Sequence, residues 1–292
     1  MQPPASPVYL WRLSANGLEA LHIRPAPASL DEASIYLPGG VYTTFRTYAG
    51  CRRAIGLQDH LKRLEQSAQG AAGLNPGMPP QALRVDPERV RALLRQALLQ
   101  GALSEARVRL SLDLSVQPGT MYLALQNLEP LPAAVYSQGV QAASSGLQRH
   151  NPKVKETGFL LEHHTRRQLM PQGVFELLLL DKQGQILEGM TSNFFGVRQG
   201  TALTAGHGVL QGVTRGIVLE LLRQAGIPVK LEAVPLAGVA RLDEAFITSS
   251  SRGVAPVVGV DGEAIGGGRP GPLAQELWQR YQRHVLEQAE DI

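Results

Sequence analysis

The sequence has little of several features that mark particular protein classes. Its single cysteine, Cys51, excludes an internal disulfide and any metal site built from several cysteines. No apolar run reaches the roughly 20 residues of a membrane span, and residues 1–18 lack the charged-then-apolar order of a secretory signal. The net charge of +3 is small, and the arginines form no basic stripe. We therefore expect a cytoplasmic protein with no metal site, no nucleic-acid partner and no membrane contact.

What the chain does contain is enough apolar material for a large core. Its 292 residues, 43% of them hydrophobic, suffice for two domains or one large one. Two prolines in the segment Leu128–Ala133 interrupt both strands and helices and indicate a linker. We expect a mixed α/β (α+β) fold with a smaller N-terminal α/β domain over residues 1–128 and a larger C-terminal domain over residues 134–292.

Local patterns predict the elements of the first half. Asn16-Gly17 is a strong hairpin turn signal, because both residues tolerate positive φ. Residues 41–48 are rich in β-branched and aromatic side chains, which favours a strand. Apolar residues at helical spacing predict a helix over residues 58–68. Asp86-Pro87 predicts the start of another, with aspartate as N-cap and proline at the first helical position.

The most informative stretch runs through the middle of the chain. Two lysines, Lys153 and Lys155, precede a helix-compatible segment and an apolar run over 174–180 that is typical of a buried strand. Turn residues at 181–184 then return the chain to Glu188. A lysine and a carboxylate are what would hold pyridoxal phosphate at both ends, one as a Schiff base and one on the ring nitrogen. Taken as an arbitrary pair, the two side chains would more often be an exposed salt bridge.

Three segments in sequence order strengthen the first interpretation. They are Pro-Lys-Val-Lys-Glu-Thr-Gly-Phe-Leu from Pro152, Glu-Gly-Met-Thr-Ser-Asn-Phe-Phe-Gly-Val from Glu188, and Gly-Val-Thr-Arg from Gly212. Together they resemble the class IV, or fold type IV, pyridoxal phosphate enzymes. This family comprises the branched-chain aminotransferases, the D-amino acid aminotransferases and 4-amino-4-deoxychorismate lyase. The resemblance covers about residues 37–272.

The resemblance implies a two-domain fold with the cofactor between the domains and a homodimer as the assembly. It assigns the cofactor lysine to Lys155 rather than Lys153, and the acid on the ring nitrogen to Glu188. Arg63, in a His-Leu-Lys-Arg-Leu helical pattern, matches the arginine that reaches the cofactor phosphate. Considered alone, Arg63 would more often be a solvated helical side chain.

The resemblance also supplies the remaining phosphate ligands. Val213 and Thr214 stand at a predicted helix start, where free N–H groups favour an anion, although a Gly-x-Thr segment alone could be only a cap. Ser250 takes the place of a phosphate-binding threonine. The predicted cofactor-binding set is thus Arg63, Lys155, Glu188, Val213, Thr214 and Ser250, with Lys155 as the catalytic residue.

The predicted substrate-binding residues are Tyr42, Arg107, Arg109 and Ser251. Arg107 and Arg109 share one face of the predicted strand over 107–114, so together they could grip a carboxylate; a solvent-facing polar edge is the alternative. By resemblance, Arg109 matches a substrate-contacting arginine, whereas Arg107 replaces a tyrosine.

Departures from the family pattern limit the substrate assignment. Branched-chain enzymes carry a tyrosine shortly after the lysine, whereas here the residues are Gly158-Phe159-Leu160, with no hydroxyl. Thr43 replaces a glutamate, as in some deoxychorismate lyases. We therefore expect an aminotransferase that transfers an amino group between an amino acid and a 2-keto acid. Among amino acids, the family pattern favours the branched-chain ones weakly. The alternatives are 4-amino-4-deoxychorismate lyase and a protein that binds the cofactor without turnover.

Overall fold

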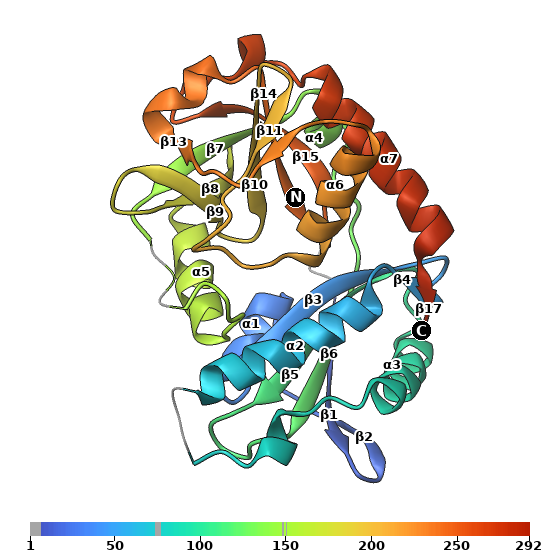
Figure 1. Ribbon diagram of the computed structural model, residues 1–292. Coiled ribbons are helices and arrows are strands. Elements are labelled where there is room, and N and C mark those ends of the chain that lie inside the picture. The colour runs from blue at the N-terminus through green and yellow to red at the C-terminus, as the bar shows by residue number, and fades with distance from the viewer. Residues whose placement is uncertain (1–6, 74–76, 148, 150) are drawn as a thin grey trace. The chain divides into compact units, whose positions relative to one another are not determined.

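The computed structural model describes residues 7–73, 77–147, 149 and 151–292 (Figure 1). By its internal contacts the chain divides into two compact units, which we describe separately. The first comprises Met1–Glu129, Val154–Gln168 and Gln288–Ile292, and the second comprises Pro130–Lys153 and Leu169–Glu287. Within the described residues, no helix is both long and apolar enough to cross a membrane.

The first unit is built on an antiparallel sheet of seven strands, in the order β17-β4-β3-β5-β6-β1-β2. The strands are β1 (Val8–Ser14), β2 (Gly17–Ala20), β3 (Gly40–Tyr48), β4 (Arg53–Ala54), β5 (Ala106–Asp113), β6 (Met121–Asn127) and β17 (Glu290–Asp291). The predicted hairpin at Asn16-Gly17 is confirmed, since Ser14 pairs with Gly17 at the turn between β1 and β2.

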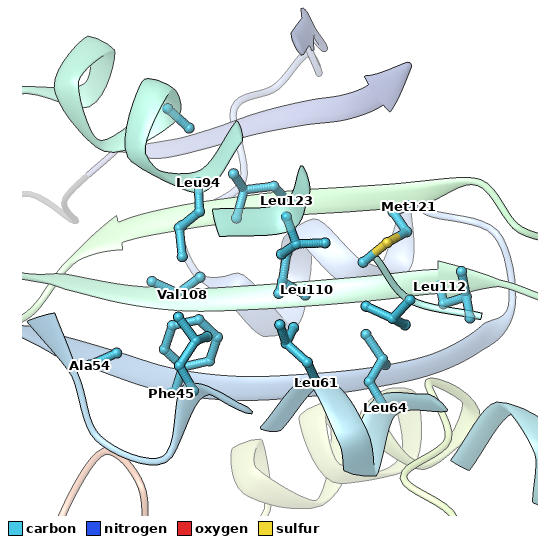
Figure 2. Close-up of a cluster of buried hydrophobic side chains, with 14 of the residues drawn as sticks. Phe45, Ala54, Leu61, Leu64, Leu94, Val108, Leu110, Leu112, Met121 and Leu123 are labelled. Atoms are coloured by element: carbon cyan, nitrogen blue, oxygen red, sulfur yellow. The ribbon is translucent and has the colours of Figure 1, made fainter. Parts of the chain in front are cut away.

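Helices α2 (Leu57–Ala72) and α3 (Pro87–Gly101) pack on one face of this sheet. Leu61 and Leu64 of α2 face Leu110 and its neighbours on β5 (Figure 2). The predicted start of α3 is confirmed, because the Asp86 side chain accepts the Arg89 N–H at 3.1 Å. A cap of this kind stabilises a helix by about 1 kcal/mol.

The opposite face of the sheet carries a smaller apolar cluster. Leu10 of β1 and Ala124 of β6 pack there against Leu30 of α1 (Leu30–Ile35). Strand side chains alternate between faces, so Trp11 and Leu123 belong to the larger core instead. The same alternation puts Tyr42 and Arg109 on the α1 side. The remaining helices of this unit are α5 (Gly158–Gln168) and a 3-10 turn, η1 (Pro80–Leu83).

The second unit contains a sheet whose central strands close into a ring. Its ten strands are β7 (Val140–Ser145), β8 (Val174–Leu180), β9 (Gln185–Gly189), β10 (Asn193–Arg198), β11 (Thr201–Leu203), β12 (Val229–Lys230), β13 (Val234–Pro235), β14 (Glu244–Ser249), β15 (Gly253–Val260) and β16 (Glu263–Ala264). β7 runs parallel to β8 and to β15. The path β10-β14-β15-β7-β8-β9 closes where Glu188 of β9 pairs with Asn193 of β10.

Helices and short turns complete the second unit. They are α4 (Ala134–Ser137), α6 (Val213–Gln224), α7 (Pro272–Gln288), η2 (Leu236–Arg241) and η3 (Gly266–Gly268). The interior of the ring is apolar and includes Phe194, Ile247 and Val257. The predicted buried strand over 174–180 and the predicted hairpin to Glu188 are both present as β8 and β9.

Two segments pack with the first unit, although the sequence assigned them to the second domain. Backbone pairing explains the segment that carries Lys155: the Tyr42 N–H donates to the Lys155 carbonyl at 2.9 Å, and the Thr157 N–H to the Gly40 carbonyl at 2.8 Å. The last five residues pack there because Ile292 is buried and its N–H donates to the Arg52 carbonyl. The main division, after Glu129, lies in the predicted linker. The domain bounds of 1–128 and 134–292 stay a prediction.

Candidate functional site

Glu188 is a buried carboxylate on which several donors converge. Its side chain, 3% exposed, forms an ion pair in which Arg149 Nε lies 2.8 Å from Glu188 Oε1. Oε2 accepts the Asn193 side-chain amide at 3.2 Å and the Leu210 N–H at 3.1 Å. Hydrogen bonds and a nearby cation favour the charged form of a buried carboxylate, so these three contacts favour the ionised form of Glu188.

A tight hairpin places this acid. The carboxylate of Asp181 accepts the N–H groups of Gln183 and Gln185 at 2.9 and 2.8 Å, which fixes the turn between β8 and β9. Gly184 adopts φ of +74°, a conformation that glycine tolerates best. Because the turn fixes the strand register, it also determines that Glu188 lies opposite Leu179 of β8, and at its other side Glu188 pairs with Asn193 of β10.

Arg149 is a site residue that the sequence reasoning missed. Its guanidinium also donates to the Met190 carbonyl at 3.2 Å, so it contacts both the acid and the loop that follows it. A second buried arginine, Arg215 of α6, donates to the Ala205 carbonyl at 2.9 Å. Burial lowers the pKa of Arg215, while the charge of Glu188 raises it in part. No spacing rule links Arg149 to an acid so much further along the chain, so the sequence offered no signal.

The N-terminus of α6 has the features of an anion site. Its N-cap, Gly212, has no side chain to bond the first N–H groups of the helix. Val213 and Thr214 are buried at this end, and the Thr214 hydroxyl donates to the Ser250 hydroxyl at 3.4 Å. A Cβ at Gly212 would collide with the Asn193 side chain, so this close approach requires glycine. The structure thus brings together the three second-unit residues predicted to hold a phosphate.

A second buried acid braces the loops beside this site. Glu176 Oε2 accepts the hydroxyls of Thr191 and Ser192 at 2.7 and 2.8 Å and pairs with Arg252 at 3.0 Å. Burial raises the pKa of the Glu176 carboxyl, but Arg252 and the two hydroxyls outweigh it, so the pKa lies below its ordinary value. Arg252 also donates to the Ser249 hydroxyl at 2.9 Å, which ties down the turn that follows β14.

This second acid was also missed, although the sequence carried a signal for it. Glu176 is the one charged residue within the apolar run over 174–180. Such a residue is buried only with partners. Ser251, the predicted substrate-side residue of the turn after β14, is half-buried.

Lys155 belongs to the first unit and is half-buried there. Its N–H donates to the Ser67 hydroxyl at 3.3 Å, and its ammonium lies 4.6 Å from the centre of the Tyr42 ring. A cation over an aromatic face is held electrostatically. Lys153, by contrast, is exposed and lies in the second unit. The two lysines therefore have different environments, and Lys155 is the one positioned by its neighbours.

Arg63 takes part in a buried polar network of the first unit. One of its terminal nitrogens donates to the Thr43 hydroxyl at 2.9 Å and lies 3.3 Å from His60 Nδ1. The Thr43 hydroxyl in turn lies 2.7 Å from the same His60 nitrogen. Both Thr43 and His60 are fully buried, whereas Lys62, next to Arg63 on α2, is exposed.

The two strand arginines have different surroundings. Arg109 is buried, pairs with Asp31 at 2.7 Å and donates to the Leu30 carbonyl and the Ser34 hydroxyl. Arg107 is half-buried and lies opposite Arg46 in the pairing of β3 with β5. Arg109 is thus committed to α1, a contact that strand alternation could not reveal, and a joint grip on a carboxylate stays a prediction.

The predicted site residues thus fall into two groups. Lys155, Tyr42, Arg63, Arg107 and Arg109 lie in the first unit, and Glu188, Val213, Thr214, Ser250 and Ser251 lie in the second. Among the residues that the structure describes, no cluster of three or more His, Cys, Asp or Glu could hold a metal ion.

Comparison with known proteins identifies the family. The family model for class IV amino-transferases matches residues 40–260, more than two thirds of the chain. The chain belongs to the class IV aminotransferase family. The predicted family, the α/β fold of type IV enzymes and the aminotransferase function are therefore confirmed.

Relatives and solved structures agree with this assignment. A Thermotoga maritima protein named as a probable branched-chain-amino-acid aminotransferase is 29% identical over 90% of this chain and 92% of its own. A solved structure from the same organism, with the same activity in its name, has a TM-score of 0.76 at 26% identity, and 96% of each chain is covered. A D-alanine aminotransferase of Bacillus licheniformis is 32% identical, but over only 46% of this chain and 48% of its own.

Proposed function

We propose that this class IV aminotransferase uses pyridoxal 5′-phosphate to move an amino group between an amino acid and a 2-keto acid. The observation that carries the proposal is the buried Glu188 carboxylate, held by Arg149, Asn193 and Leu210. An acid fixed in its charged form suits the protonated ring nitrogen of this cofactor. Among proteins of similar fold, a branched-chain amino acid aminotransferase that is 21% identical, with a TM-score of 0.75, was solved with pyridoxamine 5′-phosphate.

The other residues present also fit this cofactor. The α6 terminus and the hydroxyls of Thr214 and Ser250 form a donor set for a phosphate, to which Arg63 would add a positive charge. Lys155 would supply the amine that holds the aldehyde carbon. When bound, the cofactor supplies an electron-withdrawing ring that takes up the electron pair left at the substrate α-carbon.

In this proposal one residue of the chain stabilises charge on the cofactor ring and another transfers the proton. Glu188 would keep the ring nitrogen protonated, and Lys155 Nζ, neutral once displaced, would take the proton from the α-carbon. Until Lys155 bonds to the cofactor, the contact of its ammonium with the Tyr42 ring would limit the positions that this side chain can take. Val213 and Thr214 would hold the phosphate end, so that the reacting carbon stays in place during proton transfer.

The substrate side is proposed on fewer contacts. Tyr42, Arg107, Arg109 and Ser251 are its residues, and the names of the relatives favour a branched-chain amino acid. Of these four, Arg109 already pairs with Asp31 at 2.7 Å. We also propose that the protein is a homodimer and is cytoplasmic. Sedimentation that shows a fully active monomer would contradict the homodimer.

A half-reaction screen tests the proposed function. The yellow enzyme is mixed separately with L- and D-amino acids and with aminodeoxychorismate, and the absorbance and products are followed. Conversion of the bound cofactor to pyridoxamine phosphate by an amino acid, fastest with L-leucine, L-isoleucine or L-valine, is expected. Pyruvate release from aminodeoxychorismate would instead identify the lyase, and no response to any compound would identify a binding protein without turnover.

A further inference from the structure

The hydrogen-bond network around Arg63 has a defined direction. Arg63 has only N–H groups to offer, so it donates to the Thr43 hydroxyl oxygen at 2.9 Å. The hydroxyl has one proton, and His60 Nδ1 lies 2.7 Å from its oxygen. If Nδ1 accepts that proton, the guanidinium donates to the hydroxyl and the hydroxyl donates to the imidazole. Each hydrogen bond then has one donor and one acceptor.

The environment of His60 selects this direction. The imidazole is fully buried, and Nδ1 lies 3.3 Å from the terminal nitrogen of Arg63. Burial first, and then the charges of Arg63 and Lys155, lower the pKa of His60 well below its ordinary value of 6.5. A neutral imidazole accepts at one nitrogen and donates at the other. Nδ1 is the nitrogen beside the Arg63 guanidinium, which can only donate, so Nδ1 is the acceptor here.

Both partners of Arg63 in this network are rigidly placed. Thr43 lies on β3, and His60 is three residues before Arg63 on α2, so the network links the helix to the sheet beneath it. His60 also packs against the ring of Phe45, with 5.2 Å between ring centres. A guanidinium that is anchored at one terminal nitrogen loses rotamer freedom before any ligand arrives.

We propose that Thr43 and His60 are positioning residues for Arg63: a neutral hydroxyl–imidazole relay holds the guanidinium ready for the cofactor phosphate without neutralising its charge. This inference rests on the proposed phosphate role of Arg63. A carboxylate in place of Thr43 would also orient an arginine, but it would offset the positive charge that a dianionic phosphate requires. The relay orients the arginine and leaves its charge available.

Paired variants of Thr43 test the relay with little change in shape. Thr43→Val replaces the hydroxyl by a methyl group, and Thr43→Ser keeps the hydroxyl. The full-length chain is titrated with pyridoxal phosphate and, separately, with pyridoxal, which lacks the phosphate. We expect Thr43→Val to weaken pyridoxal phosphate binding about two- to ten-fold and to leave pyridoxal binding nearly unchanged, because the Arg63 guanidinium must then be ordered when the phosphate binds. Thr43→Ser should retain most of the affinity.

His60→Leu should reproduce the effect of Thr43→Val, and Lys62→Ala should change neither affinity. Thr43→Val added to Arg63→Ala should cause no further loss, since the relay acts only through the arginine. Equal weakening of both ligands by Thr43→Val, or no weakening of either while Arg63→Ala still impairs pyridoxal phosphate binding, would overturn the relay and leave the proposed function intact. If Arg63→Ala itself spares the preference for the phosphorylated ligand, the proposed phosphate site fails and the relay with it.

Discussion

Arg149 Nε lies 2.8 Å from Glu188 Oε1, and the two side chains are only 6% and 3% exposed. A charge pair removed from water to this extent cannot lose one member without leaving the other buried and uncompensated. The pair joins a loop before Lys155 to the strand end that carries the proposed cofactor acid. Its integrity therefore matters both for stability and for the charge of Glu188.

Arg149→Met should destabilise the protein by about 3–5 kcal/mol, because it strands the Glu188 carboxylate in the interior. The change is read from urea unfolding monitored by fluorescence. Arg149→Met combined with Glu188→Gln should recover much of the loss, since no charge of the pair then remains buried. If Arg149→Met alone is as stable as the parent, the ion pair between Arg149 and Glu188 does not form in solution.

Glu188→Gln should slow removal of the α-proton by about two to three orders of magnitude while some cofactor is retained, because a neutral amide stabilises a protonated ring nitrogen poorly. Stopped-flow half-reactions at saturating amino acid measure this step. Glu263→Gln, which changes an exposed acid of the same unit, serves as the control. Equal rates in the parent and in Glu188→Gln would rule out the proposed role.

Glu176 should make stability depend on acid pH. Its folded-state pKa lies below the ordinary 4.5, so its contribution is complete above pH 4.5 and is lost as the pH falls through the folded-state pKa. Glu176→Gln should lower stability at pH 7 and flatten the acid limb of a plot of unfolding free energy against pH. Glu276→Gln, which removes the exposed pair with Arg280, should leave that limb unchanged. Identical acid limbs in the parent and Glu176→Gln would contradict the assignment.

Arg63→Ala should weaken pyridoxal phosphate binding by roughly one to two orders of magnitude, as a charge-assisted bond is worth about 1.5–3 kcal/mol. Arg63→Lys should recover only part of the loss, because an ammonium cannot reproduce the planar fork. Equilibrium titration gives both affinities. Lys62→Ala, one position away on the exposed side of α2, is the matched control. If it weakens binding as much as Arg63→Ala, then the face of α2 that carries Arg63 is not the one that contacts the phosphate.

Features that depend on a few neighbouring residues were predictable from the sequence. The buried stripe of α2 follows from apolar residues at helical spacing, and the start of α3 follows from one aspartate and one proline. The β8–β9 hairpin needed only an apolar run and a turn. In each case the information lies within a short stretch of chain, so local preference and tertiary structure agree.

Contacts between distant segments were not predictable in the same way. The ion pair of Arg149 with Glu188 depends on the register of β8 and β9 and on the path of a loop without periodicity. The packing of Val154–Gln168 with the first unit depends on backbone pairing with β3, which any residues could form. The commitment of Arg109 to Asp31 likewise arises only once α1 lies on the sheet.

The assignment of Lys155 as the cofactor lysine is the centre of this account, and covalent trapping tests it most directly. Borohydride reduction of the yellow enzyme fixes the bond between lysine and cofactor, and mass spectrometry of tryptic peptides locates it. We predict the label on Lys155, with cleavage lost after that residue and retained after Lys153. A label on Lys153, or on no lysine, would contradict the account.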